Sequence, residues 1–183
     1  MRATNIAISQ KDSFSLSYNL IYNLHMTNLL EAIKKECIDK NATIACAESI
    51  TLGKLTYTIG SISGASRFLL GGIIAYQDKV KEHILGVPAE MLKTYSAVSN
   101  QTCTEMINGI KRIFSPTIAL ATTGYAGPQV LQEPVGLVFI GVCIRDNLSV
   151  HKFKFSGSRR EIQDRTVEKA IEILWEKIKS EHL

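Results

Sequence analysis

Hydrophobic and polar positions fall into two kinds of segment along most of the chain. Five apolar runs are typical of buried strands, at 43–47, 69–76, 117–123, 135–144 and 149–155. The last two runs flank the polar triplet Arg145-Asp146-Asn147, which indicates a hairpin turn. The pattern therefore predicts a sheet that contains at least one antiparallel pair.

The segments between these runs carry apolar residues three and four positions apart, as amphipathic helices do. Helices are expected to begin near five residues, which are Asn28, Thr51, Val80, Ser99 and Ser158. Two of these starts form a capping box with a glutamate three residues later, Asn28 with Glu31 and Ser158 with Glu161. We expect Asn28 to open a helix of about three turns.

Alternation of strands and helices with one hairpin predicts an α/β three-layer domain with a mixed sheet. Residues 1–25 have weak periodicity and are interpreted as an N-terminal extension that is poorly ordered. Residues 26–183 show neither an internal repeat nor a linker, so we expect them to form one domain.

Composition limits the classes of molecule that this protein is expected to bind. The net charge is +4, the basic residues are scattered and aromatic residues make up only 7% of the chain, which argues against a nucleic-acid surface. A mild positive balance also suits an anionic small molecule. The longest apolar run has half the length of a membrane span, so no membrane partner is expected. Four widely spaced cysteines are interpreted as buried reduced thiols of a cytoplasmic protein.

Three segments that follow predicted strands carry the candidate chemistry, at 47–53, 75–81 and 122–128. Ligands of open α/β sheets bind at the carboxyl ends of strands. None of the three segments matches a phosphate-binding loop, a dinucleotide fingerprint or an esterase elbow. No histidine stands at zinc-ligand spacing from a cysteine, so no metal site is predicted.

Ser49 lies at a strand-to-helix turn, where a serine is either a helix cap or a nucleophile. A nucleophilic serine needs a base and N–H donors for the oxyanion. The four histidines are poorly placed to be that base, whereas an uncharged lysine can serve. Lys79 and Lys81 both follow the second strand, and spacing alone leaves each of them as a base or as a solvated helix residue.

These residues also carry a resemblance to a known family. The run Ala47-Glu48-Ser49-Ile50-Thr51-Leu52-Gly53 is similar to the A-E-S-C-T-G-G element of CinA-type C-terminal domains, also called nicotinamide-nucleotide amidohydrolases (PncC). Further matches follow in the same order at 68–76, 85–88, 97–99, 123–128, 134–136 and 155–159. Lys81 stands five residues after Tyr76, and the matches together span about residues 29–178.

The resemblance implies an amidohydrolase that deamidates nicotinamide mononucleotide to nicotinate mononucleotide and ammonia, without metal or cofactor. In family terms Ser49 matches the nucleophile and Lys81 the lysine of a Ser/Lys dyad, with Tyr76 beside them as a third catalytic residue. Seven further positions are implied to bind substrate: Glu48, Thr51, Gly53, Thr123, Gly124, Gly127 and Arg159. The 5′-phosphate is expected at a helix N-terminus or on Arg159.

The same resemblance implies a three-layer α/β/α fold with a mixed, mostly parallel five-stranded sheet. It also implies the stand-alone form of the domain, a homo-oligomer and a cytoplasmic role in pyridine nucleotide salvage. The partner is then a small-molecule nucleotide, with no nucleic acid and no membrane.

The chain departs from the family pattern at three places. Ile50 replaces the cysteine of the motif, Leu52 replaces its first glycine, and Gln129–Glu133 replaces a Gly-rich stretch. Because the last change stiffens and shortens a loop, two other functions stay open. One is a non-catalytic interaction module in competence or the DNA-damage response, and the other is a nucleotide-binding domain without hydrolysis.

Overall fold

One mixed sheet forms the centre of the molecule. The computed structural model describes residues 10–128, 134–181 and 183. Its strands are β1 (Ile44–Glu48), β2 (Leu69–Ile74), β3 (Ile118–Gly124), β4 (Leu137–Ile144) and β5 (Asn147–Lys154). They lie in the order β2-β1-β3-β4-β5, with β1 parallel to both of its neighbours and β4 antiparallel to β3 and β5. The five-stranded mixed sheet is therefore confirmed, and every strand except β4 points the same way.

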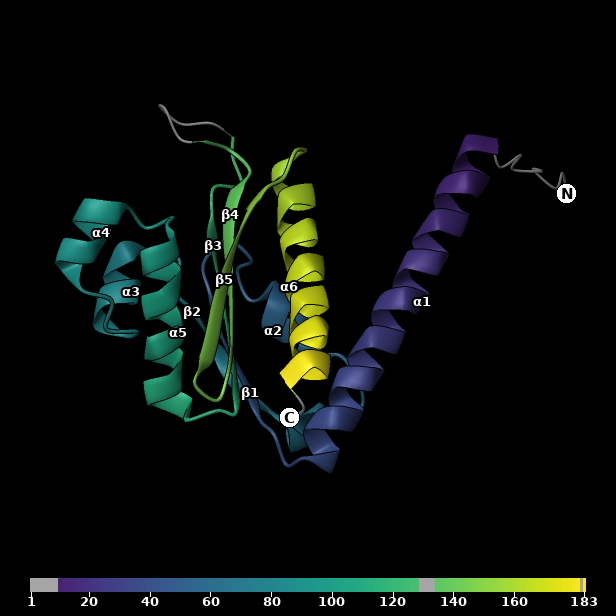
Figure 1. Ribbon diagram of the computed structural model, residues 1–183. Coiled ribbons are helices and arrows are strands. Elements are labelled where there is room, and N and C mark those ends of the chain that lie inside the picture. Colours follow the sequence, from purple (N-terminus) through teal and green to yellow (C-terminus); the bar gives the residue numbers. More distant parts are fainter. Residues whose placement is uncertain (1–9, 129–133, 182) are drawn as a thin grey trace, which may run out of the picture.

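Helices cover both faces of the sheet. They are α1 (Gln10–Asp39), α2 (Lys54–Gly60), α3 (Asp78–His83), α4 (Ala89–Tyr95), α5 (Asn100–Phe114) and α6 (Arg159–Glu181), with a short 3₁₀ turn at Ala65–Arg67. Figure 1 shows α2 and α6 on one side of the sheet, with α1 outside α6, and α3, α4 and α5 on the other side. This arrangement is the expected three-layer α/β/α fold.

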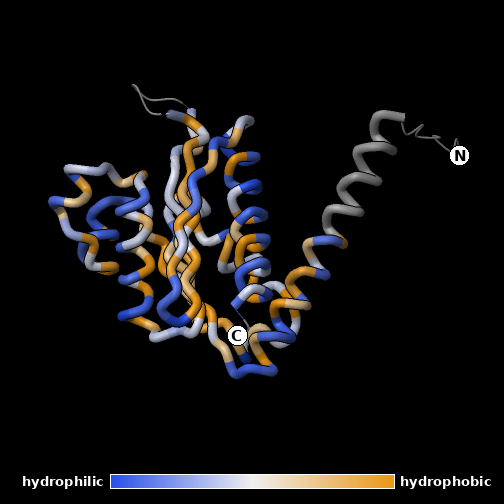
Figure 2. Tube along the Cα trace, viewed as in Figure 1, coloured by the Kyte–Doolittle hydropathy of each residue, from blue (hydrophilic) through white to orange (hydrophobic). Residues whose placement is uncertain are grey.

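Alternation along β1 divides the apolar core into two clusters. Ile44 and Cys46 belong to the cluster under α1, α2 and α6, whereas Ala45 and Ala47 belong to the cluster under α5. Because β1 has a paired neighbour on each edge and helices on each face, all five of its residues are buried. Figure 2 shows apolar positions concentrated along the strands and on the helix faces that meet them.

Local capping chemistry explains where two helices begin. The Ser99 hydroxyl accepts the backbone N–H of Thr102 at 3.1 Å and so caps α5. At the start of α6, Glu161 accepts the backbone N–H of Ser158, and the N–H of Glu161 donates back to the Ser158 hydroxyl. Both caps were predicted from sequence and are confirmed.

Four helices differ from expectation. α3 begins at Asp78 rather than Val80, a difference of two residues at a helix start that has no side-chain cap. α1 begins at Gln10 and not at Asn28, because residues 10–39 contain no glycine or proline that would end the helix before that capping box. α2 begins at Lys54 rather than Thr51, after a turn that contains Leu52 in a left-handed conformation. α4 was not predicted, since none of its residues is buried and it has no apolar stripe.

Two expectations fall wholly or partly on residues outside the described part of the chain. Of the extension expected at 1–25, residues 1–9 lie outside the described residues, and residues 10–25 form the first half of α1. The departure at Gln129–Glu133 also lies outside the described residues. All four cysteines are buried free thiols, as expected. Among the helices that the structure describes, none has both the length and the apolar character required to cross a bilayer.

Candidate active site

The carboxyl ends of β1, β2 and β3 surround a pocket of about 430 Å³. This volume falls in the range of about 300–1,000 Å³ that is typical of small-molecule sites. The residues that line the pocket are Ser49, Ile50, Tyr76, Asp78, Lys81, Ala97, Val98, Thr123, Gly124, Tyr125, Ala126, Gly127, Pro128 and Arg159. Parallel pairing of β1 with both neighbours brings together three segments that lie far apart in the sequence.

Ser49 is the first residue after β1, and its hydroxyl opens into the pocket. Its backbone N–H donates to the Thr122 carbonyl on β3 at 2.9 Å, which extends the sheet by one residue. The residue is only 7% exposed. Its hydroxyl has no hydrogen bond within the described chain, where every fully buried polar side-chain atom has a partner. The Ser49 oxygen is therefore reachable from the pocket.

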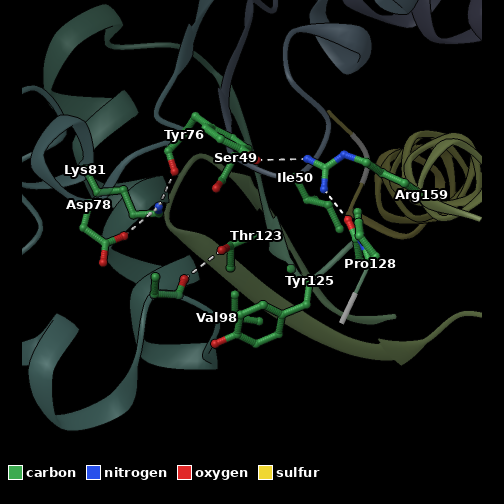
Figure 3. Close-up of a pocket in the computed structure, with 14 residues that line it drawn as sticks. Ser49, Ile50, Tyr76, Asp78, Lys81, Val98, Thr123, Tyr125, Pro128 and Arg159 are labelled. Atoms are coloured by element: carbon green, nitrogen blue, oxygen red, sulfur yellow. Dashed lines mark hydrogen bonds and ion pairs between the residues drawn. The ribbon is translucent and has the colours of Figure 1, made fainter. Parts of the chain in front are cut away.

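Lys81 is a buried basic side chain on the opposite wall. It lies on α3, its residue is 2% exposed, and its amine contacts the Tyr76 carbonyl at 3.3 Å and an Asp78 carboxylate oxygen at 3.2 Å. Figure 3 shows the amine on the side of the pocket where the Ser49 hydroxyl points. The two groups do not hydrogen-bond to each other in the described structure. Lys79 is exposed and does not line the pocket, so of the two candidate lysines only Lys81 lies in the site.

Tyr76 and Arg159 close one side of the pocket. The Arg159 guanidinium donates to the Tyr76 hydroxyl at 3.0 Å and to the Gly127 carbonyl, so it bridges the segment after β2 and the segment after β3 (Figure 3). Arg159 is the first residue of α6, where the free N–H groups of a long helix also favour anions.

The wall formed by the end of β3 is tightly packed. The hydroxyl of Thr123 donates to the Ala97 carbonyl at 2.7 Å, which joins β3 to the loop before α5. At Gly124 a Cβ atom would come within 2.8 Å of Ile50 and 2.7 Å of the Leu137 carbonyl. A glycine is needed at this position because the Ser49 turn approaches the strand so closely.

Three of the predicted substrate-binding residues do not line the pocket. Glu48 is completely buried, and its carboxylate accepts hydrogen bonds from Thr51 and from the backbone at the start of α2. Thr51 is buried beneath the same turn. The N–H of Gly53 donates to Glu48 at 2.9 Å, so it is unavailable to a bound oxyanion. The structure places these residues behind Ser49, whereas Thr123, Gly124, Gly127 and Arg159 line the cavity.

Sequence reasoning missed Asp78, Val98 and Tyr125 as pocket residues. Asp78 and Tyr125 lie inside two of the segments that carry the candidate chemistry, and Val98 lies inside the family match at 97–99, so the signal was present although the individual residue was not. The guanidinium of Arg159 places a positive charge at the mouth of the pocket. This charge suits an anionic ligand.

The Cys46 thiol lies on β1, three residues before Ser49, and is unreactive. Burial raises the pKa of the Cys46 thiol, and the negative charge of Glu48 adds to that effect, so Cys46 stays protonated. Within the described part of the chain, no cluster of three histidine, cysteine or acidic residues is arranged to hold a metal ion.

Known sequences match this chain over most of its length. The family described as CinA C-terminal domain matches residues 26–178. A protein of Desulforamulus reducens named as competence-damage inducible is 41% identical over 144 residues, and a CinA-like protein of Dictyoglomus turgidum is 36% identical over 156 residues. These alignments cover 78% and 84% of this chain but only 35% and 38% of the relatives. The chain thus spans little more than a third of their length.

Solved structures match over almost their whole length. The competence damage-inducible protein A (ComA) of Klebsiella pneumoniae is 28% identical with a TM-score of 0.81, and the match covers 84% of this chain and 97% of that one. The competence/damage inducible protein CihA of Agrobacterium tumefaciens is 32% identical with a TM-score of 0.78, covering 81% and 93%. Sequence and fold therefore agree that this chain belongs to the CinA C-terminal domain family.

Proposed function

We propose that this chain is a metal-independent serine amidohydrolase that deamidates nicotinamide mononucleotide to nicotinate mononucleotide and ammonia. The observation that carries the proposal is the pairing of an unpartnered Ser49 hydroxyl and the buried Lys81 amine on the walls of one pocket. The CinA resemblance supplies the identity of the substrate. The guanidinium of Arg159 at the mouth of the pocket suits the phosphate of a nucleotide.

The first half of the reaction forms an acyl-enzyme. Uncharged Lys81 takes the proton of the Ser49 hydroxyl, directly or after the short approach that substrate binding brings about. The Ser49 oxygen then forms a bond to the carboxamide carbon, and the electron pair of the C=O bond moves onto its oxygen. As the C–N bond breaks, the Lys81 ammonium gives its proton to the nitrogen, which leaves as ammonia.

The second half of the reaction restores the enzyme. Water gives a proton to the uncharged Lys81 and attacks the Ser49 ester carbon. The ester C–O bond breaks, the Ser49 oxygen recovers its proton from Lys81, and the carboxylic acid product gives its remaining proton to water and leaves as nicotinate mononucleotide. Backbone N–H groups of Ile50 and Thr51 directly follow the nucleophile and are the candidate donors to the oxyanion.

Arg159 is the proposed ligand of the nucleotide phosphate. It is exposed at the mouth of the pocket and is held by the Tyr76 hydroxyl and the Gly127 carbonyl, which use two of its five N–H groups. The remaining donors suit phosphate oxygens, and the N-terminus of α6 adds its partial positive charge. Tyr76 would then support Arg159 and, through its backbone carbonyl, Lys81.

The test is release of ammonia from nicotinamide mononucleotide by the purified chain. Ser49→Ala is expected to abolish turnover with little loss of stability, because the hydroxyl has no hydrogen bond in the described structure. Lys81→Ala is expected to reduce kcat by about two to four orders of magnitude, as loss of a general base does. Lys79→Ala is the matched control and should retain full activity, since that lysine is exposed and outside the pocket.

Each alternative function predicts a different result in the same experiment. Absence of ammonia release across a panel of nicotinamide and other amide nucleotides would overturn the amidohydrolase. Calorimetric binding of the mononucleotide without product would favour the nucleotide-binding domain. Equal capture of a competence or DNA-repair protein by the wild type and by Ser49→Ala, again without turnover, would favour the interaction module.

A further inference from the structure

The buried Glu48 carboxylate stands directly before the proposed nucleophile and makes an unusual number of hydrogen bonds. One oxygen accepts from the Thr51 hydroxyl at 2.6 Å and from the N–H groups of Gly53 and Leu55 at 2.9 and 3.1 Å. The other oxygen accepts from the N–H and the hydroxyl of Thr56 at 2.8 and 2.5 Å. All five donors come from residues 51–56, on the far side of Ser49.

These bonds leave Glu48 no capacity for a ligand. A carboxylate offers about four lone-pair sites, and five donors already share them. The residue is also 0% exposed and does not line the pocket. A buried carboxylate is tolerated where its oxygens are fully hydrogen-bonded, and here the chain itself satisfies them.

The Glu48 network fixes the turn that carries Ser49. Thr51 gives its only hydroxyl proton to Glu48, so its 2.7 Å contact with the Thr122 hydroxyl must be donated by Thr122. The carbonyl of Thr122 in turn accepts the Ser49 N–H. The turn is thereby tied at both ends, to β3 before the nucleophile and to the start of α2 after it.

Two residues of the turn have a left-handed backbone conformation that the Glu48 network stabilises. Leu52 has φ +53° and Gly53 has φ +90°, two successive left-handed residues in the turn between β1 and α2. A leucine seldom adopts this conformation unless its surroundings enforce it. The bond from the Gly53 N–H to Glu48 holds the chain directly after Leu52.

We propose that Glu48 is a positioning residue whose carboxylate holds the turn of residues 49–53, and with it the Ser49 hydroxyl, in the orientation that faces Lys81. This role rests on the proposed amidohydrolase function, but it predicts a backbone effect that can be measured without substrate. A positioning residue acts on the geometry of the reacting groups, so its loss lowers kcat much more than it changes KM.

Glu48→Gln is the sharpest variant because it keeps the size of the side chain. Glutamine has one oxygen and one NH₂ group, so on one side an amide donor must face the donors of Thr56 or those of Gly53 and Leu55. We expect kcat to fall at least tenfold with KM changed less than threefold. Hydrogen exchange should accelerate at the amides of residues 49–56 and stay unchanged in β3.

Thr51 provides a second route that leaves Glu48 in place. Thr51→Val removes the hydroxyl between Glu48 and Thr122 without changing shape, and it should lower kcat in the same way. Thr51→Ser keeps the hydroxyl and should restore activity to within threefold of the wild type. Ile171→Ala, in the buried face of α6, serves as a stability control that should lower Tm without lowering kcat.

The outcomes separate this inference from the proposed function. If the wild type released no ammonia, the amidohydrolase would fail, whereas the exchange measurement would still decide the role of Glu48. Unchanged exchange at residues 49–56 in Glu48→Gln would overturn the positioning role. So would a kcat loss that Ile171→Ala reproduces at equal Tm, because the effect would then be one of general stability. Failure of Glu48→Gln to fold would move the decision to the two Thr51 variants.

Discussion

Replacing Asp78 with asparagine tests the electrostatic setting of the proposed base. Asp78 Oδ1 lies 3.2 Å from Lys81 Nζ, and asparagine keeps the shape of the side chain while removing its charge. Together with the Tyr76 carbonyl, the Asp78 carboxylate holds the Lys81 amine in place. Because a neutral amide holds an amine less strongly than a carboxylate does, we expect Asp78→Asn to lower kcat for the proposed reaction.

The magnitude follows from the distance and from the exposure of the pair. Coulomb's law gives about 1.3 kcal/mol for unit charges 3.2 Å apart in water and about 5 kcal/mol at an effective dielectric constant of 20. The Asp78 side chain is 62% exposed, so solvent screens it and the lower value applies. Because about 1.4 kcal/mol corresponds to a factor of ten in rate, kcat should fall by about threefold to tenfold.

The assay is kcat for ammonia release from nicotinamide mononucleotide, measured for the wild type and for Asp78→Asn. Glu82→Gln is the matched control, because it removes a carboxylate from the same helix but outside the pocket lining. A kcat that is unchanged or raised in Asp78→Asn would refute the role of this contact in holding Lys81.

Three further predictions concern stability, thiol chemistry and assembly. A Cβ atom on Gly72 would lie 2.3 Å from the Thr56 hydroxyl, which Glu48 holds in place, so Gly72→Ala should lower the free energy of unfolding by about 1–3 kcal/mol. Urea denaturation measures this loss, and an unchanged midpoint would contradict the packing argument. Burial raises the pKa of Cys103 to about 12, so iodoacetamide at pH 8 should label it only after unfolding. Rapid labelling of the native protein would show that the α5 core opens. The homo-oligomer implied by the family resemblance predicts a light-scattering mass of at least about twice the 20.2 kDa of one chain, and a single-chain mass would remove it.

Elements with local signals were predictable from the sequence. The caps at Ser99 and Ser158 satisfy helix N–H groups from within three residues, so the sequence alone contains both partners. α2 is different, because the N–H groups at its start are satisfied by Glu48, which lies six residues before the helix and across a left-handed turn. No pattern confined to a capping box could have placed its first residue at Lys54.

Which residues share the pocket depends on the order of the strands in the sheet, and no pattern in the sequence predicts that order. Ser49, Lys81 and Thr123 come from three separate segments, and they share one cavity because β1 lies between β2 and β3. Arg159 joins them from a position 78 residues after Lys81, through bonds to Tyr76 and Gly127. Family resemblance named these residues as candidates, and the structure brings them into one cavity, whereas spacing alone left Lys79 and Lys81 undecided.

The motif that contains Ser49 combines two physical roles that the sequence cannot separate. Ser49 and Ile50 line the cavity, whereas the side chain of Glu48 turns away from it and holds the turn. A motif shows which residues occur together. Only burial and hydrogen bonding distinguish a side chain that contacts a ligand from a side chain that holds the backbone. Leu52 supports this distinction, because it adopts a left-handed conformation suited to the glycine of the family pattern while its side chain stays 43% exposed. A leucine holds this conformation only where its surroundings enforce it, which is the behaviour expected if Glu48 dictates the shape of the turn rather than the local preference of residue 52.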